Sequence, residues 1–123
     1  MNVQKPNPAV DKSYAFALRI VKLYKQLCDE NKEYVLSKQV LRSGTSIGAN
    51  VEEAIGGQSS KDFTAKISIA YKEARESQYW LRLLKDSGYI QMNQANSLLT
   101  DCEELVKLLG SIQLTMRQKI DAS

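Results

Sequence analysis

Apolar residues recur every three or four positions along most of the chain, which is the spacing of amphipathic helices. The pattern predicts helices over residues of about 8–30, 35–55, 61–87 and 93–117. No stretch combines the alternation of a strand with the chemistry of a hairpin turn. Four amphipathic helices with short links favour an all-α fold, an antiparallel up-down-up-down four-helix bundle that forms a single domain over residues 1–123.

Local signals place the ends of these helices. Asn7 before Pro8 is typical of a helix start, because asparagine caps the first turn and proline fits the first helical position. Gly88 is expected to end the third helix, and Asn93 is expected to cap the fourth. Residues 117–123 are expected to form a frayed polar tail.

The first helical segment carries two apolar stripes side by side. One holds Val10, Tyr14, Ala17, Val21, Tyr24 and Cys28, and the other holds Phe16, Ile20, Leu23 and Leu27. Together they cover about half of the helix, which is wider than the ~100° face of an ordinary surface helix. The excess predicts burial against another subunit, and Phe16 and Ile20 are candidates for oligomer or helix packing.

The second segment is rich in small and polar residues between Arg42 and Ala54, whose intrinsic helix propensity is modest. Gly44 and Gly48 lie four positions apart in it, and each costs a helix about 1 kcal/mol relative to alanine. Close approach by another helix would explain both glycines, and a local kink is the alternative. We interpret them as helix-packing positions.

The composition narrows the chemistry and the compartment. Histidine is absent, which removes Ser-His-Asp and Cys-His nucleophiles together with histidine-based zinc and di-iron sites. The net charge of +3 is far below the excess of a dedicated nucleic-acid arm. Cys28 and Cys102 fit apolar helical positions, where core packing is favoured over nucleophile chemistry. With no signal peptide and no run of about 18 apolar residues, we expect a cytoplasmic protein that does not contact a membrane. We also expect no cofactor and no metal.

Residues 42–54 resemble the second-helix signature of small four-helix-bundle proteins encoded by intervening sequences of bacterial 23S rRNA genes, the S23 ribosomal protein family. The resemblance continues through Asp62-Phe63, Ile69-Ala70, Lys72-Glu73-Ala74-Arg75-Glu76, Tyr79-Trp80-Leu81-Arg82-Leu83-Leu84 and Gly88-Tyr89-Ile90. It implies a bundle fold and ring-like homo-oligomers, often pentamers. The family is also similar to the accessory variability protein of diversity-generating retroelements, a basic bundle that partners a reverse transcriptase and nucleic acid.

Two glutamates of the third segment, Glu73 and Glu76, lie next to its core face. Carboxylates three positions apart on a helix repel each other unless a cation is near, and Arg42 is the candidate partner. The alternative is a carboxylate metal site that also uses Glu52 or Glu53. We favour the ion pair.

Cations gather on two other helical faces. The third segment carries Lys72, Arg75, Tyr79 and Arg82, and the polar face of the first carries Arg19 and Lys22. Cations around a tyrosine are typical of a phosphate-binding surface with a stacking residue. The alternative for both faces is an ordinary solvated helix surface, although a symmetric ring would repeat a weak basic field and strengthen it.

These observations predict a non-enzymatic homo-oligomeric helical bundle that acts as a scaffold or interaction protein. Its partners would be further copies of itself and another protein. Trp80 is interpreted as an interface or core-edge aromatic residue. The alternative function is an accessory protein that binds RNA or DNA through a basic surface of the oligomer. An enzyme is disfavoured, because the sequence has no phosphate loop and no metal-ligand spacing.

Overall fold

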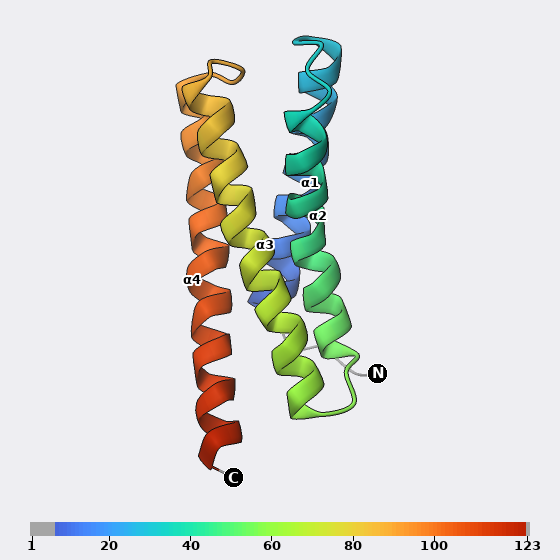
Figure 1. Cartoon of the computed structure of the whole chain (residues 1–123), viewed down its shortest axis with the longest axis vertical. Helices are drawn as coiled ribbons and strands as arrows, with labels where there is room; N and C mark the ends of the chain where they lie inside the picture. The colour runs from blue at the N-terminus through green and yellow to red at the C-terminus, as the bar shows by residue number, and fades with distance from the viewer. Residues whose placement is uncertain (1–6, 123) are drawn as a thin grey trace.

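The computed structural model describes residues 7–122. It contains four helices, α1 (Pro8–Asp29), α2 (Leu36–Ile55), α3 (Ser60–Asp86) and α4 (Met92–Ala122), and no strand within that range. The chain runs up α1, down α2, up α3 and down α4 (Figure 1). Each helix packs against its neighbours in this order and α1 also contacts α4, so α1 and α3 are diagonal to each other. The all-α up-down-up-down bundle expected from the sequence is confirmed.

The capping signals at two helix ends are present as expected. The side chain of Asn7 accepts a hydrogen bond from the backbone N–H of Val10 at 3.3 Å, and Pro8 is the first residue of α1. Gly88 follows α3 with a φ of +81°, a left-handed conformation that glycine adopts without a Cβ penalty. The α3–α4 link can therefore turn sharply, which keeps the two helices antiparallel.

The fourth helix differs from the sequence-based expectation at both ends. It begins at Met92, so Asn93 lies inside the first turn, where its side chain accepts a hydrogen bond from the next backbone N–H. It continues to Ala122, so the expected frayed tail over 117–123 is wrong for the described residues. The apolar spacing persists to Ile120, which is half-buried. The helix thus runs past the point where polar composition suggested a stop.

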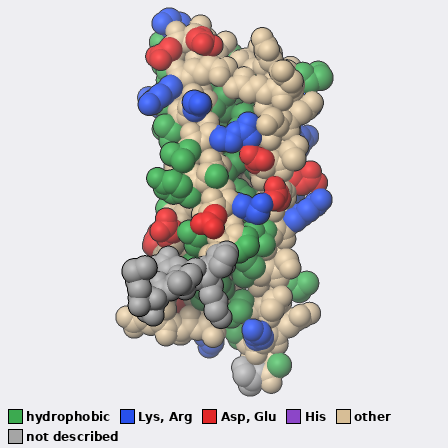
Figure 2. Space-filling model, turned by 180° about the vertical axis from the view of Figure 1, so that it is seen from behind, with side chains coloured by type: hydrophobic (Ala, Val, Ile, Leu, Met, Phe, Trp, Pro, Cys, Tyr) green, Lys and Arg blue, Asp and Glu red, His purple; other side chains and the backbone are tan. Residues whose placement is uncertain are grey.

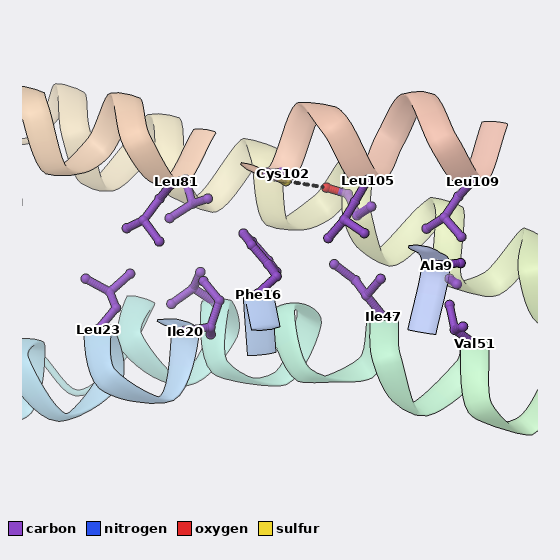
Figure 3. Close-up of a cluster of buried hydrophobic side chains, with 14 of the residues drawn as sticks. Ala9, Phe16, Ile20, Leu23, Ile47, Val51, Leu81, Cys102, Leu105 and Leu109 are labelled. Carbon is purple, nitrogen blue, oxygen red and sulfur yellow. Dashed lines mark hydrogen bonds between the residues drawn. The ribbon is translucent and has the colours of Figure 1, made fainter. Parts of the chain in front are cut away.

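The core is formed by one buried stripe from each helix. The largest buried side chains are Phe16, Ile20, Leu23 and Leu27 of α1, Val40 and Ile47 of α2, Ile67, Leu81 and Leu84 of α3, and Leu98, Leu105 and Leu109 of α4. Figure 3 shows the side chains of α1 and α2 meeting those of α3 and α4, with Phe16 in the middle. In α1 the core therefore takes the stripe that begins at Phe16 and leaves the other one at the surface.

The two glycines of α2 mark a close approach to α1. A Cβ atom added to Gly44 would lie 2.8 Å from the Cγ1 and Cγ2 atoms of Ile20. A Cβ atom added to Gly48 would lie 3.4 Å from the carbonyl oxygen of Ser13. Both positions belong to an uninterrupted α2, so close packing and not a kink accounts for them.

A carboxylate that sequence reasoning missed caps the start of α2. Glu33 accepts hydrogen bonds from the backbone N–H groups of Val35 at 3.1 Å, Leu36 at 2.9 Å and Ser37 at 2.7 Å. Partial burial acts to raise the pKa of Glu33, but these hydrogen bonds outweigh it, and its pKa lies below the ordinary value. The negative charge also interacts favourably with the positive end of the helix dipole.

We expect Glu33→Ala to lower the free energy of unfolding at neutral pH by about 1–2 kcal/mol, because it leaves helix N–H groups without their acceptor. The folded-state pKa is lowered, so this contribution is present above the ordinary carboxyl pKa of about 4 and is lost as the pH falls through the folded value. Urea denaturation of the wild type and the variant at neutral and acidic pH measures the difference. Glu30→Ala, at an exposed site near the same turn, is the control.

Candidate functional site

The stripe of α1 that the core does not use forms an apolar surface. Tyr14 is 59% exposed and Leu18 is 57% exposed. Val10, Ala17 and Val21 lie beside them on the same side of the helix and are half-buried. We call these five residues the α1 apolar surface. Figure 2, which shows the molecule from behind, has hydrophobic side chains gathered over α1.

The close approach of α2 explains why this surface stays open. Gly44 and Gly48 bring the two helix backbones together but contribute no side chain that could cover α1. The next outward position of α2, Thr45, turns its hydroxyl back to the carbonyl oxygen of Leu41 at 2.7 Å. Tyr14 and Leu18 therefore extend beyond the cover that α2 provides.

The opposite side of α1 is tied to α4 by polar contacts, which we call the α1–α4 seam. Lys12 forms a salt bridge with Glu104, Arg19 forms one with Asp101 at 2.5 Å, and the side-chain amides of Gln26 and Gln94 bond to each other at 2.9 and 3.2 Å. These α1 residues are seven positions apart, so they recur on one face of the helix. Charged side chains of both signs accordingly mix toward α4 in Figure 2.

The cations expected to act together on nucleic acid lie on two helices that are diagonal to each other in the bundle. Arg19 is held in the α1–α4 seam by Asp101, and Lys22 is exposed beside it. Lys72 and the other basic residues of the third helix are on α3, which is diagonal to α1. The structure therefore does not bring Arg19 and Lys22 together with the cations of α3.

The α3 basic stripe consists of Lys72, Arg75, Tyr79 and Arg82, all exposed. Within residues 7–122, none of its three cations forms a salt bridge. Tyr79 is 53% exposed and packs edge-on against the ring of Trp80, with 5.0 Å between the ring centroids. The stripe therefore presents positive charges that the protomer leaves unneutralised, around an exposed ring.

Arg42 joins α2 to α3 through both glutamates that the sequence singled out. Its guanidinium forms a salt bridge with Glu73 at 3.1 Å and another with Glu76. Glu76 also accepts a hydrogen bond from the indole N–H of Trp80 at 3.0 Å. Burial acts to lower the pKa of Arg42. The hydrogen bond to Glu76 and the negative charges of Glu73 and Glu76 outweigh this effect, so the pKa of Arg42 lies above its ordinary value. The guanidinium is half exposed, so this cluster orients the helices more than it stabilises them.

The carboxylates that the sequence offered as an alternative metal site are not gathered around one point. Glu53 forms a salt bridge with Lys66 at 3.0 Å, and Glu73 and Glu76 are taken by Arg42. In the described part of the chain, no three His, Cys, Asp or Glu side chains are grouped so that they could hold a metal ion. Of the two alternatives for Glu73 and Glu76, the structure has the ion pair with Arg42.

Both cysteines are free thiols. Cys102 is buried, and its thiol donates to the carbonyl oxygen of Ala74 at 3.2 Å, the contact drawn in Figure 3. Burial, with a smaller effect from the charge of Asp101, raises the pKa of Cys102 to about 12. The thiol stays protonated at neutral pH, which suits packing and not nucleophilic attack.

Comparison with known proteins identifies a family. The family model of the 23S rRNA-intervening sequence protein matches residues 5–111. A crystal structure of a protein of unknown function from the S23 ribosomal protein family of Bacteroides thetaiotaomicron is 55% identical, with a TM-score of 0.84. The match covers 85% of this chain and 97% of that one. No curated protein sequence is similar enough to count as a match. Over residues 7–122, no helix has the length and apolar character needed to cross a membrane.

Proposed function

Because the chain belongs to the 23S rRNA-intervening sequence protein family, and the solved relative described above is a protein of unknown function, we propose its role from its surfaces. We propose a non-enzymatic homo-oligomeric bundle that acts as a scaffold for another protein in the cytoplasm. A ring, often a pentamer, is the form that the family resemblance implies. Two free thiols fit a reducing compartment.

The α1 apolar surface carries this proposal. Full burial of a leucine side chain is worth about 1.5–3 kcal/mol, and Tyr14 and Leu18 keep more than half of their surface in water. Each of them can therefore still gain roughly 1 kcal/mol from a partner, and the neighbouring half-buried residues add to the contact. Contiguous exposed apolar side chains on a small domain are typical of a protein interface.

Three features support a role without catalysis. The sequence has no histidine, so the commonest general base is missing. Glu73 and Glu76, the two glutamates nearest the core, both form salt bridges with Arg42. The buried thiol of Cys102 is held protonated. Arg42, the two glutamates and the Cys102 thiol are therefore engaged in contacts within the bundle.

Leu18→Glu tests the proposal, because it places a charge on one of the two most exposed side chains of the α1 apolar surface. We expect the wild type to form an oligomer at micromolar concentration and Leu18→Glu to weaken subunit association by at least about tenfold, since a buried unpaired charge is costly. Size-exclusion chromatography with light scattering measures the mass, and circular dichroism checks that the helices remain.

Ala15→Glu is the matched control, because it adds the same charge to an exposed position on another side of α1. It should leave the oligomer intact. A wild-type chain that is monomeric at micromolar concentration contradicts assembly. An oligomer that tolerates Leu18→Glu as well as Ala15→Glu shows that the subunits meet elsewhere.

A second candidate function, binding of RNA or DNA, is favoured by the α3 basic stripe. The two cations of the α1–α4 seam and Arg42 of α2 each have a carboxylate partner. Lys72, Arg75 and Arg82 have none within residues 7–122. Free cations on one helix face can exchange small counterions for phosphates, so binding should weaken steeply with salt. Arg82→Glu should reduce such binding to single-stranded and duplex nucleic acid alike, as measured by fluorescence anisotropy.

A further inference from the structure

A hollow lies between α3 and α4, next to the α3 basic stripe. Its volume is about 230 Å³. Its lining consists of Tyr71 from α3 and Gly110, Gln113, Leu114 and Arg117 from α4. Neither the α1 apolar surface nor the cluster around Arg42 uses these residues.

Gly110 shapes this hollow. A glycine inside a helix costs about 1 kcal/mol relative to alanine, and Gly110 lies far from both ends of α4. A Cβ atom added there would lie 3.3 Å from the Cε2 atom of Tyr71. The missing side chain lets the Tyr71 ring lie against the backbone of α4, where the ring forms an apolar wall.

The other walls combine an apolar side chain, an amide and positive charge. Leu114 is 60% exposed and Gln113 is half-buried, so both face the opening. On α3, Arg75 donates a hydrogen bond to the hydroxyl of Tyr71 at 3.1 Å, and its guanidinium lies 5.9 Å from the ring centroid. Arg117 comes from α4, and within residues 7–122 neither arginine forms a salt bridge.

We infer that this hollow binds one nucleotide unit. The base packs against Tyr71 and Leu114, and the amide of Gln113 supplies both a donor and an acceptor for the base edge. Arg75 and Arg117 bind the phosphate, because a guanidinium matches phosphate oxygens with paired N–H donors. The inference rests on the second candidate function, because Arg75 of the α3 basic stripe donates a hydrogen bond to Tyr71, which lines the hollow. The unit is either a free nucleotide or part of a single strand.

Gln113→Glu tests the hollow, because it replaces the amide donor for the base edge with a negative charge in the lining, without changing the size of the side chain. Gln118→Glu is the matched control, since it makes the same change at an exposed position of α4 that does not line the hollow. The probes are a fluorescent oligoadenylate, a duplex of similar charge and adenosine monophosphate. We expect Gln113→Glu to weaken oligoadenylate binding about tenfold and Gln118→Glu to change it less than about twofold. Arg117→Gln should weaken it as well, with helix content unchanged by circular dichroism.

The remaining outcomes distinguish binding in the hollow from binding along the α3 basic stripe. Shifts of the Tyr71 and Gln113 resonances on adding adenosine monophosphate assign the site to free nucleotides, and shifts with the oligoadenylate alone assign it to single strands. If Arg82→Glu weakens binding but Gln113→Glu and Gln118→Glu have equal effects, the inference is wrong and the stripe function stands. If none of the three probes binds, both the inference about the hollow and the second candidate function are wrong.

Discussion

Phe16→Ala is expected to lower the free energy of unfolding by about 3–5 kcal/mol, a large part of the total stability of a small domain. The ring is only 1% exposed and lies in the middle of the bundle. Its removal loses the transfer free energy of the ring and leaves a cavity that rigid helices on both sides cannot close. Urea denaturation followed by circular dichroism measures the change.

Leu114→Ala is the control for this variant, because it removes an apolar side chain that is 60% exposed. Its effect should stay within about 0.5 kcal/mol. Both variants are compared with the wild type at one protein concentration, because subunit association adds to apparent stability. A Phe16→Ala variant that keeps its stability but loses assembly would place Phe16 at the subunit interface and contradict its place in the core.

Gly44→Ala is expected to lower the free energy of unfolding by about 2 kcal/mol, although alanine is the better helix former. The new Cβ atom would lie 2.8 Å from two atoms of Ile20, closer than van der Waals contact allows. Ile20 is fully buried and β-branched, so its side chain cannot rotate away. The two helices must move apart, and the packing lost along α1 exceeds the gain in helix propensity.

Gly48→Ala makes the same substitution one turn later and is the matched comparison. Its Cβ atom would meet Ser13 at 3.4 Å, an ordinary contact. The gain in helix propensity should then remain, and the variant should be as stable as the wild type or more stable by up to about 1 kcal/mol. Equal destabilisation by both substitutions would mean that the helices are not in contact at Gly44 as described.

The candidate surfaces could be predicted to different degrees. The contact of Arg42 with Glu73 and Glu76 was foreseeable, because two carboxylates one turn apart next to a core face require a cation. The pairing of Arg19 with Asp101 could not be foreseen. It joins α1 to α4, and the apolar pattern of a single helix does not show how that helix is rotated relative to another. The cap that Glu33 forms was missed for a different reason. It precedes a helix whose own N-cap position, Val35, makes no side-chain bond, so no local capping motif marks it.

The sequence alone determined the four helices, their order and most of their buried faces. Helix formation depends on local spacing and capping, and both are written in neighbouring residues. Only the tertiary structure decided which stripe of α1 enters the core. The stripes of Phe16 and of Tyr14 both follow the helical repeat, so spacing alone cannot rank them. The choice was made by Gly44 and Gly48, which let α2 approach along one line of α1. That approach buries Phe16 and Ile20 and leaves Tyr14 and Leu18 in water.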